Sequence, residues 1–290
     1  VEPPEAYNVG GDYVCKLRKG LYDLKQSAKT WHDQLTKDLE KKGFQELKKD
    51  PCIYTKSGVI LLVYVDDILI LGKEADVDKA KTNLAELYEI KDLAEARFYL
   101  GIEIIRGRRT RQIVLSQQRY IQQVVRRFGM KECKPVKTSA QGKSRCETTI
   151  PATMPEEVQY RELVGCLMFI ATRTRPDILC AVRSLSAHLH DYTAEDWRAA
   201  KRVLRYLKGT EDATLSLGDE TKPEKIEVYT DASWADSENR RSMTGVCVYL
   251  HGALVIYYSR RQKSVKTSSS EAEYVAVAEG FKSLRRLQQL

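Results

Sequence analysis

Residues 59–72, VILLVYVDDILILG, carry two adjacent acidic residues inside an otherwise apolar run. Apolar segments of this length, bounded here by Gly58 and Gly72, are typical of two buried strands that meet at a tight turn. Two bare carboxylates at the end of such a hairpin, Asp66 and Asp67, are costly unless a cation binds them. The stretch therefore predicts a site of oxygen ligands for Mg²⁺-like ions, suited to phosphoryl transfer, with a solvated hairpin tip as the alternative.

The size and charge of the chain narrow the class of protein. Its 290 residues predict about two domains. The net charge of +8, from 48 Lys and Arg against 40 Asp and Glu, favours a polyanionic partner such as nucleic acid. The seven scattered cysteines include no CxxC pair, which argues against a disulfide framework and for a reducing compartment. The chain has neither an apolar run of ~18 residues nor a signal peptide, so a membrane partner is not expected.

Up to residue 130, the pattern alternates between strands and helices around the hairpin, which predicts an α+β fold. Helices are expected at 27–42, 76–87 and 117–128, and strands at 50–55, 96–105 and 112–115. Residues 131–155 are rich in Pro, Ser, Thr, Gly and Lys and predict a linker or surface excursion. The chain starts without Met and stops inside a helical pattern, so both ends are expected to be cut from something longer.

Three further helices are expected at 157–172, 176–188 and 194–208. The last has an apolar face and an opposite face that is strongly basic. That basic face could follow a phosphate backbone, chiefly through Arg198, Lys201 and Arg205. A solvated helix face is the alternative. The face consists of Arg198, Lys201, Arg202, Arg205 and Lys208.

A second group of carboxylates follows in the last part of the chain. Strands are expected at 226–230, 243–250 and 253–259, and a helix from about residue 268. Asp231 directly follows the first strand, and Glu273 lies near the edge of the apolar stripe expected to be buried on the helix. Glu271 suits the helix N-terminus instead, and Asp236 falls in a polar loop. The expected stripe is Tyr274, Val277, Ala278, Phe281 and Leu284.

The motifs, in this order, resemble those of one known family, the reverse transcriptase–RNase H region of copia-type LTR retrotransposon Pol polyproteins. The resemblance covers nearly the whole chain. The matching motifs are KLRKGLYDLKQSAKTW (16–31), LVYVDDILI (62–70), FYLGIE (98–103), LSQQRY (115–120), RFGMKECKPV (127–136), YRELVG (160–165), TRPDI (174–178), WRAAKRVLRYLKG (197–209), YTDASWA (229–235), RRSMTG (240–245) and SSSEAEY (268–274).

The resemblance implies an α+β architecture of a reverse-transcriptase-like palm and thumb, then a helical connection and a truncated RNase H-like domain. It implies a partial palm and the start of the thumb at 1–130, a linker with thumb or connection helices at 131–223, and the RNase H-like domain at 224–290. Asp66 and Asp67 would bind two Mg²⁺ ions together with a third Asp that the family places upstream. The resemblance assigns Asp231 and Glu273 to the RNase H metal site.

The resemblance also implies binding roles. Lys25, Gln26 and Tyr64 would lie near the incoming nucleotide and template, and Leu100 and Gly101 would belong to the primer grip. Asp23 stands where the family has Gly, and an Asp would repel and crowd a triphosphate.

The activity implied is RNA-directed DNA polymerisation. This fragment is expected to be inactive alone, because each of its two metal sites lacks some of its carboxylate ligands. A degenerate or domesticated nucleic-acid-binding remnant without catalysis is the alternative. The implied partners are an RNA/DNA template–primer hybrid, dNTPs, and other Pol domains including integrase and the upstream palm. The implied location is intracellular, in a cytoplasmic particle or the nucleus.

Overall fold

The computed structural model describes residues 16–21, 24–140, 159–218, 225–235 and 240–289. The described residues up to Glu95 form one compact unit, and Ala96–Gln289 contains the second. Within these ranges, no helix is both long enough and apolar enough to cross a membrane.

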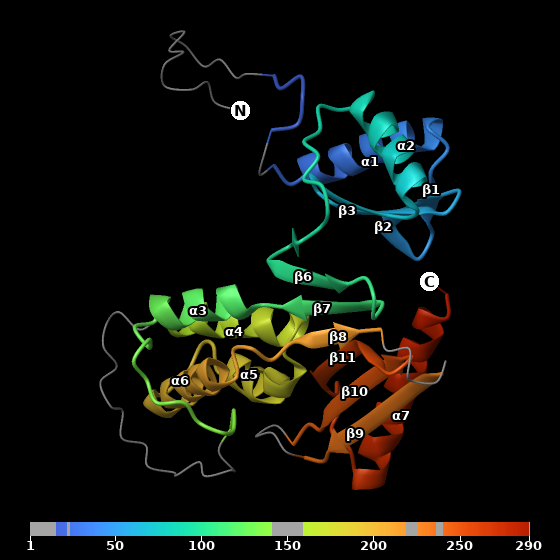
Figure 1. The fold of residues 1–290 in the computed structure, drawn as a ribbon. Coiled ribbons are helices and arrows are strands. Elements are labelled where there is room, and N and C mark those ends of the chain that lie inside the picture. The colour runs from blue at the N-terminus through green and yellow to red at the C-terminus, as the bar shows by residue number, and fades with distance from the viewer. Residues whose placement is uncertain (1–15, 22–23, 141–158, 219–224, 236–239, 290) are drawn as a thin grey trace. The chain divides into compact units, whose positions relative to one another are not determined.

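The first unit is an antiparallel sheet packed against two helices (Figure 1). The strands lie in the order β1 (Gln45–Leu47), β2 (Asp50–Lys56), β3 (Val59–Tyr64) and β4 (Asp67–Leu71). The helices are α1 (Ser27–Lys41) and α2 (Glu74–Ala85). Apolar residues spaced three to four apart on each helix, including Leu35, Leu39 and Leu84, form the core with one face of the sheet.

The predicted hairpin is confirmed, but the expectation that both of its strands are buried is wrong. Val59, Leu61 and Val63 are buried, whereas the alternate residues Ile60 and Tyr64 are exposed. The helices cover only one face of this antiparallel sheet, so side chains that alternate along a strand point alternately to the core and to solvent.

The second unit begins with a sheet whose strands come from distant parts of the chain. Its order is β5 (Phe98–Tyr99), β6 (Ile102–Gly107), β7 (Gln112–Ser116) and β8 (Leu215–Leu217). The expected strand at 96–105 is therefore interrupted, because Leu100 and Gly101 form a tight turn with φ of 48° and 80°. The sequence does not predict β8, because this strand is too short to show a clear alternation.

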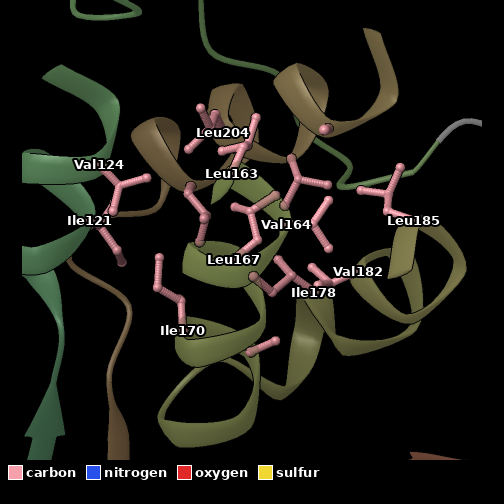
Figure 2. Packing of buried hydrophobic residues seen from close by; sticks show 14 of the residues in the cluster. Ile121, Val124, Leu163, Val164, Leu167, Ile170, Ile178, Val182, Leu185 and Leu204 are labelled. Carbon is pink, nitrogen blue, oxygen red and sulfur yellow. The ribbon is translucent and has the colours of Figure 1, made fainter. Parts of the chain in front are cut away.

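A helical core follows, made by α3 (Gln118–Arg127), α4 (Tyr160–Arg173), α5 (Leu179–Ser186) and α6 (Ala194–Gly209). The short 3₁₀ helix η1 (Pro176–Ile178) precedes α5, so the expected helix at 176–188 is shorter and starts as a 3₁₀ turn. Figure 2 shows that apolar side chains from α3, α4, α5 and α6 converge on this core. Thr193 caps α6 and forms a capping box with Asp196.

A buried arginine ties η1 to the end of α6. The side chain of Arg175 is 2% exposed and donates to Asp177 Oδ2 at 2.7 Å and to the carbonyl oxygen of Thr210 at 2.8 Å. The hydroxyl of Tyr206 also donates to Asp177, at 2.8 Å. Burial alone would raise the pKa of Asp177, but hydrogen bonds from Arg175 and Tyr206 outweigh it and lower that pKa. The TRPDI motif (174–178) thus links η1 to the C-terminal end of α6.

The last part of the second unit is a three-stranded antiparallel sheet with one long helix. Its order is β11 (Ala253–Arg261), β10 (Met243–Leu250) and β9 (Ile226–Ser233), and the helix is α7 (Ser269–Leu287). Leu250 pairs with Ala253, so His251 and Gly252 form the turn between β10 and β11. Arg183 of α5 donates to the carbonyl oxygen of Ser259 at 3.0 Å, joining the helical core to β11.

The expected buried face of α7 is wrong. Tyr274 is 82% and Phe281 62% exposed, and Val277 is exposed as well. The buried residues are the small ones, Ala272, Ala276, Gly280 and Ser283. A Cβ at Gly280 would lie 2.5 Å from Thr230 Cγ2 of β9, so α7 approaches the sheet too closely for large side chains. The small residues therefore define the packed face.

Candidate functional site

The acidic tip of the β3–β4 hairpin is a tight turn. Tyr64 pairs with Asp67, which leaves Val65 and Asp66 as the two turn residues. Val65 has φ of 55°, a left-handed conformation that is unfavourable for a β-branched residue. Asp66 and Asp67 are both exposed, so their oxygen atoms are accessible to an ion from solvent.

A tryptophan from α1 holds this turn. Trp31 Nε1 donates a hydrogen bond of 2.7 Å to the carbonyl oxygen of Val65. The Trp31 ring also contacts Tyr88 edge to face, with 5.3 Å between ring centroids. Tyr88 in turn donates to Asp38 of α1 at 3.0 Å. The sequence does not predict this role of Trp31, because a side-chain bond to a distant carbonyl leaves no sequence pattern.

The hairpin tip fits Mg²⁺ in ligand chemistry, and its two carboxylates leave the other coordination positions to further oxygen donors. Adjacent carboxylates are the hard oxygen donors that Mg²⁺ prefers, and Mg²⁺ commonly uses one or two protein carboxylates with waters and substrate phosphates. However, the described part of the chain contains no group of three or more His, Cys, Asp or Glu side chains that could hold a metal ion. Asp66 and Asp67 would hold an ion with other oxygen donors.

The residues expected near the nucleotide are only partly described. Gln26 is exposed and immediately precedes α1, where its carbonyl oxygen accepts a hydrogen bond from Thr30 Oγ1 at 3.0 Å. Lys25 is exposed in the turn before it. Tyr64 is exposed and lies opposite Asp67 on the same face of the sheet. Asp23 lies outside the described residues.

The expected primer-grip residues, Leu100 and Gly101, form the turn between β5 and β6. A Cβ at Gly101 would lie 3.0 Å from the Phe169 ring of α4, and the positive φ also favours glycine. Phe169 packs edge to face against Tyr120 of α3. The turn is therefore supported by the helical core of its own unit.

The second pair of carboxylates lies on β9 and α7. The sequence placed Asp231 directly after the strand, but Asp231 lies within β9. Its side chain is exposed. Glu273 Oε1 accepts a hydrogen bond of 3.2 Å from the backbone amide of Ala232. Thr230 faces Gly280 of α7, so alternation along the strand directs Asp231 to the other face of the sheet. The Glu273 side chain thus contacts β9 at the main-chain amide of Ala232.

Glu271 has the helix-terminal role that the sequence indicated. Its Oε2 accepts hydrogen bonds from the Thr267 backbone amide at 2.8 Å and from Thr267 Oγ1 at 3.0 Å. These two bonds, with an ion pair to Lys266, lower the pKa of Glu271. Asp236 lies outside the described residues.

The basic face of α6 is not simply solvated. Arg205 Nε donates to the carbonyl oxygen of Lys134 at 2.7 Å, and Lys208 Nζ donates to that of Cys133 at 2.8 Å. Arg198 is exposed, and Lys201 lies 5.4 Å from the centre of the Trp197 ring. Of the three residues expected to bind nucleic acid, Arg205 thus also anchors a neighbouring segment, which the sequence analysis did not anticipate.

Comparison with known proteins identifies the class. Residues 1–141 match the family model for reverse transcriptase (RNA-dependent DNA polymerase). The chain belongs to this reverse transcriptase family, and to the branch found in Pol polyproteins of copia-type retrotransposons.

Individual relatives agree with this assignment. The chain is 38% identical over 299 residues to the retrovirus-related Pol polyprotein from transposon TNT 1-94 of Nicotiana tabacum, covering 98% of this chain and 22% of that protein. It is 38% identical over 273 residues to the corresponding polyprotein from transposon RE1 of Arabidopsis thaliana, covering 92% and 18%. It is 33% identical to the putative transposon Ty5-1 protein of Saccharomyces cerevisiae, covering 96% and 92%. The chain thus spans about a fifth of the two plant polyproteins.

Proposed function

We propose that this chain is part of an RNA-directed DNA polymerase with an RNase H-like domain, which transfers nucleotides by two-metal catalysis within a Pol polyprotein. The observation that carries the proposal is the exposed Asp66–Asp67 turn, held by Trp31. Bound Mg²⁺ would activate the primer 3′-hydroxyl and stabilise the departing pyrophosphate. Asp66 and Asp67 would supply two of its protein ligands, and an Asp from upstream chain the third.

The binding partners follow from the same assignment. Lys25, Gln26 and Tyr64 would contact the incoming dNTP and template, and the turn at Leu100 and Gly101 would contact the primer. The exposure of Lys25, Gln26 and Tyr64 supports these contacts. Integrase and the upstream palm would be further parts of the same polyprotein, acting in a cytoplasmic particle or the nucleus.

The proposed RNase H metal site at Asp231 and Glu273 would need further ligands and further chain around it. Tyr274, Val277 and Phe281 lie three to four residues apart and form one exposed apolar stripe on α7. Contiguous exposed apolar residues mark interaction sites more often than single scattered ones do. Among the described strands, β9 has no neighbour beyond β10. Both features support a domain that continues with further polyprotein chain, which would cover the helix face, extend the sheet and supply the remaining metal ligands.

A primer-extension assay tests the proposal. The 290 residues alone, with Asp66 and Asp67 as their only proposed palm ligands, are expected to show no Mg²⁺-dependent nucleotide incorporation on a primed RNA template. The same chain joined to its upstream polyprotein sequence is expected to incorporate nucleotide, and Asp66→Asn is expected to abolish this. Asp78→Asn, an exposed change on α2, is the control and should leave incorporation unchanged.

Two results would contradict this assignment. Incorporation by the 290 residues alone that is lost in Asp66→Asn would disprove the expected inactivity of the fragment. Incorporation by the longer chain that survives Asp66→Asn and Asp67→Asn would disprove the metal site.

A further inference from the structure

Residues 131–140, the described part of the segment expected to be a linker or surface excursion, lie along α6 and combine with it into one basic surface. Lys208 binds the carbonyl oxygens of Lys131 and Cys133, and Arg205 binds that of Lys134. Arg202 Nη2 donates to Thr138 Oγ1 at 2.8 Å. The segment therefore follows the helix from its last turn toward its middle (Figure 1). We call this surface the composite basic patch: Lys131, Lys134, Lys137, Arg198, Lys201, Arg202, Arg205 and Lys208.

Among the described residues, the contacts that build the patch do not compensate its charge. The acceptors for Arg202, Arg205 and Lys208 are neutral oxygen atoms of the main chain and of a threonine. Elsewhere in the same unit, cations are paired with carboxylates, as in Arg119 with Glu103 at 2.7 Å. Neutral acceptors orient a cation without cancelling its charge, so the patch retains a positive potential.

Acidic residues are few in these two segments. Residues 131–140 contain Glu132, and α6 contains only Glu195 and Asp196, both in its first turn. Asp196 is engaged in the capping box with Thr193. Three lysines of the segment are exposed: Lys131, Lys134 and Lys137. Holding this many like charges together is unfavourable in the free protein, and an extended polyanion would relieve the repulsion.

We propose that the composite basic patch binds the phosphate backbone of a nucleic-acid duplex, with Lys131, Lys134 and Lys137 supplying contacts beside Arg198 and Lys201. The choice of nucleic acid as the polyanion rests on the proposed function. The ten residue steps from Arg198 to Lys208 correspond to about 15 Å of helix, which equals roughly four nucleotide steps along one strand. Arg202, Arg205 and Lys208 hold the lysine-bearing segment against the helix.

The test is a binding assay on the 290-residue chain with a fluorescent RNA/DNA hybrid, measured by anisotropy at several salt concentrations. The variant carries Lys131→Gln, Lys134→Gln and Lys137→Gln. Each lost phosphate contact lowers the slope of log affinity against log salt by about one, so a decrease of about two to three is expected. Thermal unfolding should be unchanged, because the anchoring bonds use main-chain carbonyls of this segment.

A control with equal charge change separates local contacts from overall charge. Lys263→Gln, Arg285→Gln and Arg286→Gln remove three exposed cations beside β11 and at the end of α7 in the same unit. The proposal expects a nearly unchanged salt slope for this control. Equal decreases in both triple variants, or no decrease in the segment variant, would overturn it. Binding to phosphatidylserine vesicles that drops while hybrid binding persists would also overturn it.

The outcome is separable from that of the proposed function. If the longer polyprotein chain extends primers but the segment variant binds the hybrid as tightly as the parent, the patch proposal fails and the polymerase assignment stands. The longer chain could instead fail to extend primers while the segment variant shows the expected decrease in the slope of log affinity against log salt. In that case the patch proposal stands and the polymerase assignment fails.

Discussion

The indole nitrogen of Trp31 donates a 2.7 Å hydrogen bond to the carbonyl oxygen of Val65, which lies in the turn that presents Asp66 and Asp67. Val65 is held in a left-handed conformation that costs on the order of 1–3 kcal/mol for a non-glycine residue. A hydrogen bond to the strained residue itself is well placed to offset this cost. Trp31 therefore fixes the position of the two carboxylates from a separate element.

Replacing Trp31 by Phe is expected to loosen the acidic turn without unfolding the unit. Phe retains an aromatic ring against Tyr88 but has no donor for Val65 O. The loss of one hydrogen bond is expected to cost about 1 kcal/mol, and amide hydrogen exchange at Val65–Asp67 should accelerate. Trp197→Phe, a change in the other unit, is the control. Unchanged exchange at the turn in Trp31→Phe would contradict the role of Trp31.

The close approach of α7 to β9 predicts an unusual response to a helix-favouring substitution. Gly280→Ala should destabilise the chain by about 1–3 kcal/mol, because the new methyl group would meet Thr230 and Val228. Gly165→Ala in α4 is the matched control, since no atom lies within 4 Å of its Cβ position. That variant should be neutral or up to about 1 kcal/mol more stable. Urea unfolding of both variants measures the difference, and equal effects would contradict the close packing of α7 on β9.

This helix shows where the sequence was insufficient. Its start was predictable, because Ser268 accepts a hydrogen bond from the Glu271 backbone amide as a local cap. Its buried face was not, because hydrophobicity identifies the face that prefers burial rather than the face that contacts the sheet. Gly280 is buried by close packing on β9, which is a property of the partner surface. Tyr274 and Phe281 point to a surface that nothing among the described residues covers.

The Arg175–Asp177 pair predicts a pH-dependent contribution to stability. The pKa of Asp177 is lowered in the folded chain, so its contribution is present above the unfolded pKa of about 3.9 and is lost as the pH falls through the folded value. Asp177→Asn should cost about 1–2 kcal/mol at pH 7, near the lower end for a charged hydrogen bond, because the carboxylate is partly exposed.

The pH series checks the sign of this effect. The difference in unfolding free energy between the parent and Asp177→Asn should be constant from pH 7 to about 5 and should close below about pH 4. Asp212→Asn, at an exposed position of the same unit, should change stability by only a few tenths of a kcal/mol. A difference that widens on acidification would contradict the assignment of Arg175 as the dominant partner.

Because the apolar face of α7 is exposed, a charged substitution there should have little effect on the stability of the chain. Phe281→Glu should change the stability of the 290-residue chain by less than about 0.5 kcal/mol and should reduce self-association in sedimentation experiments. Leu163→Ala in the buried helical core is the contrast, with an expected loss of about 2–5 kcal/mol. A large loss of stability in Phe281→Glu would mean that this face is covered in solution.

Local signals account for most of what the sequence predicted correctly. The hairpin at 59–71 and the start of the last helix near residue 268 depend on neighbouring residues, as turns and caps do. Contacts between distant residues were not predictable: the bond from Trp31 to Val65, the anchoring of Lys134 by Arg205, and the strand β8. Each depends on a partner far away in the chain that no periodicity reveals.

The pairing of Val114 with Ser216 has a consequence for synthesis of the chain. The edge of β7 emerges from the ribosome about 100 residues before β8, which corresponds to roughly 5–20 s at ~5–20 residues per second. During this interval, the backbone groups of β7 on that side are exposed and could pair with another nascent chain. Slowing translation across residues 117–214 should therefore increase aggregation, and a chaperone that shields strand edges should counteract it.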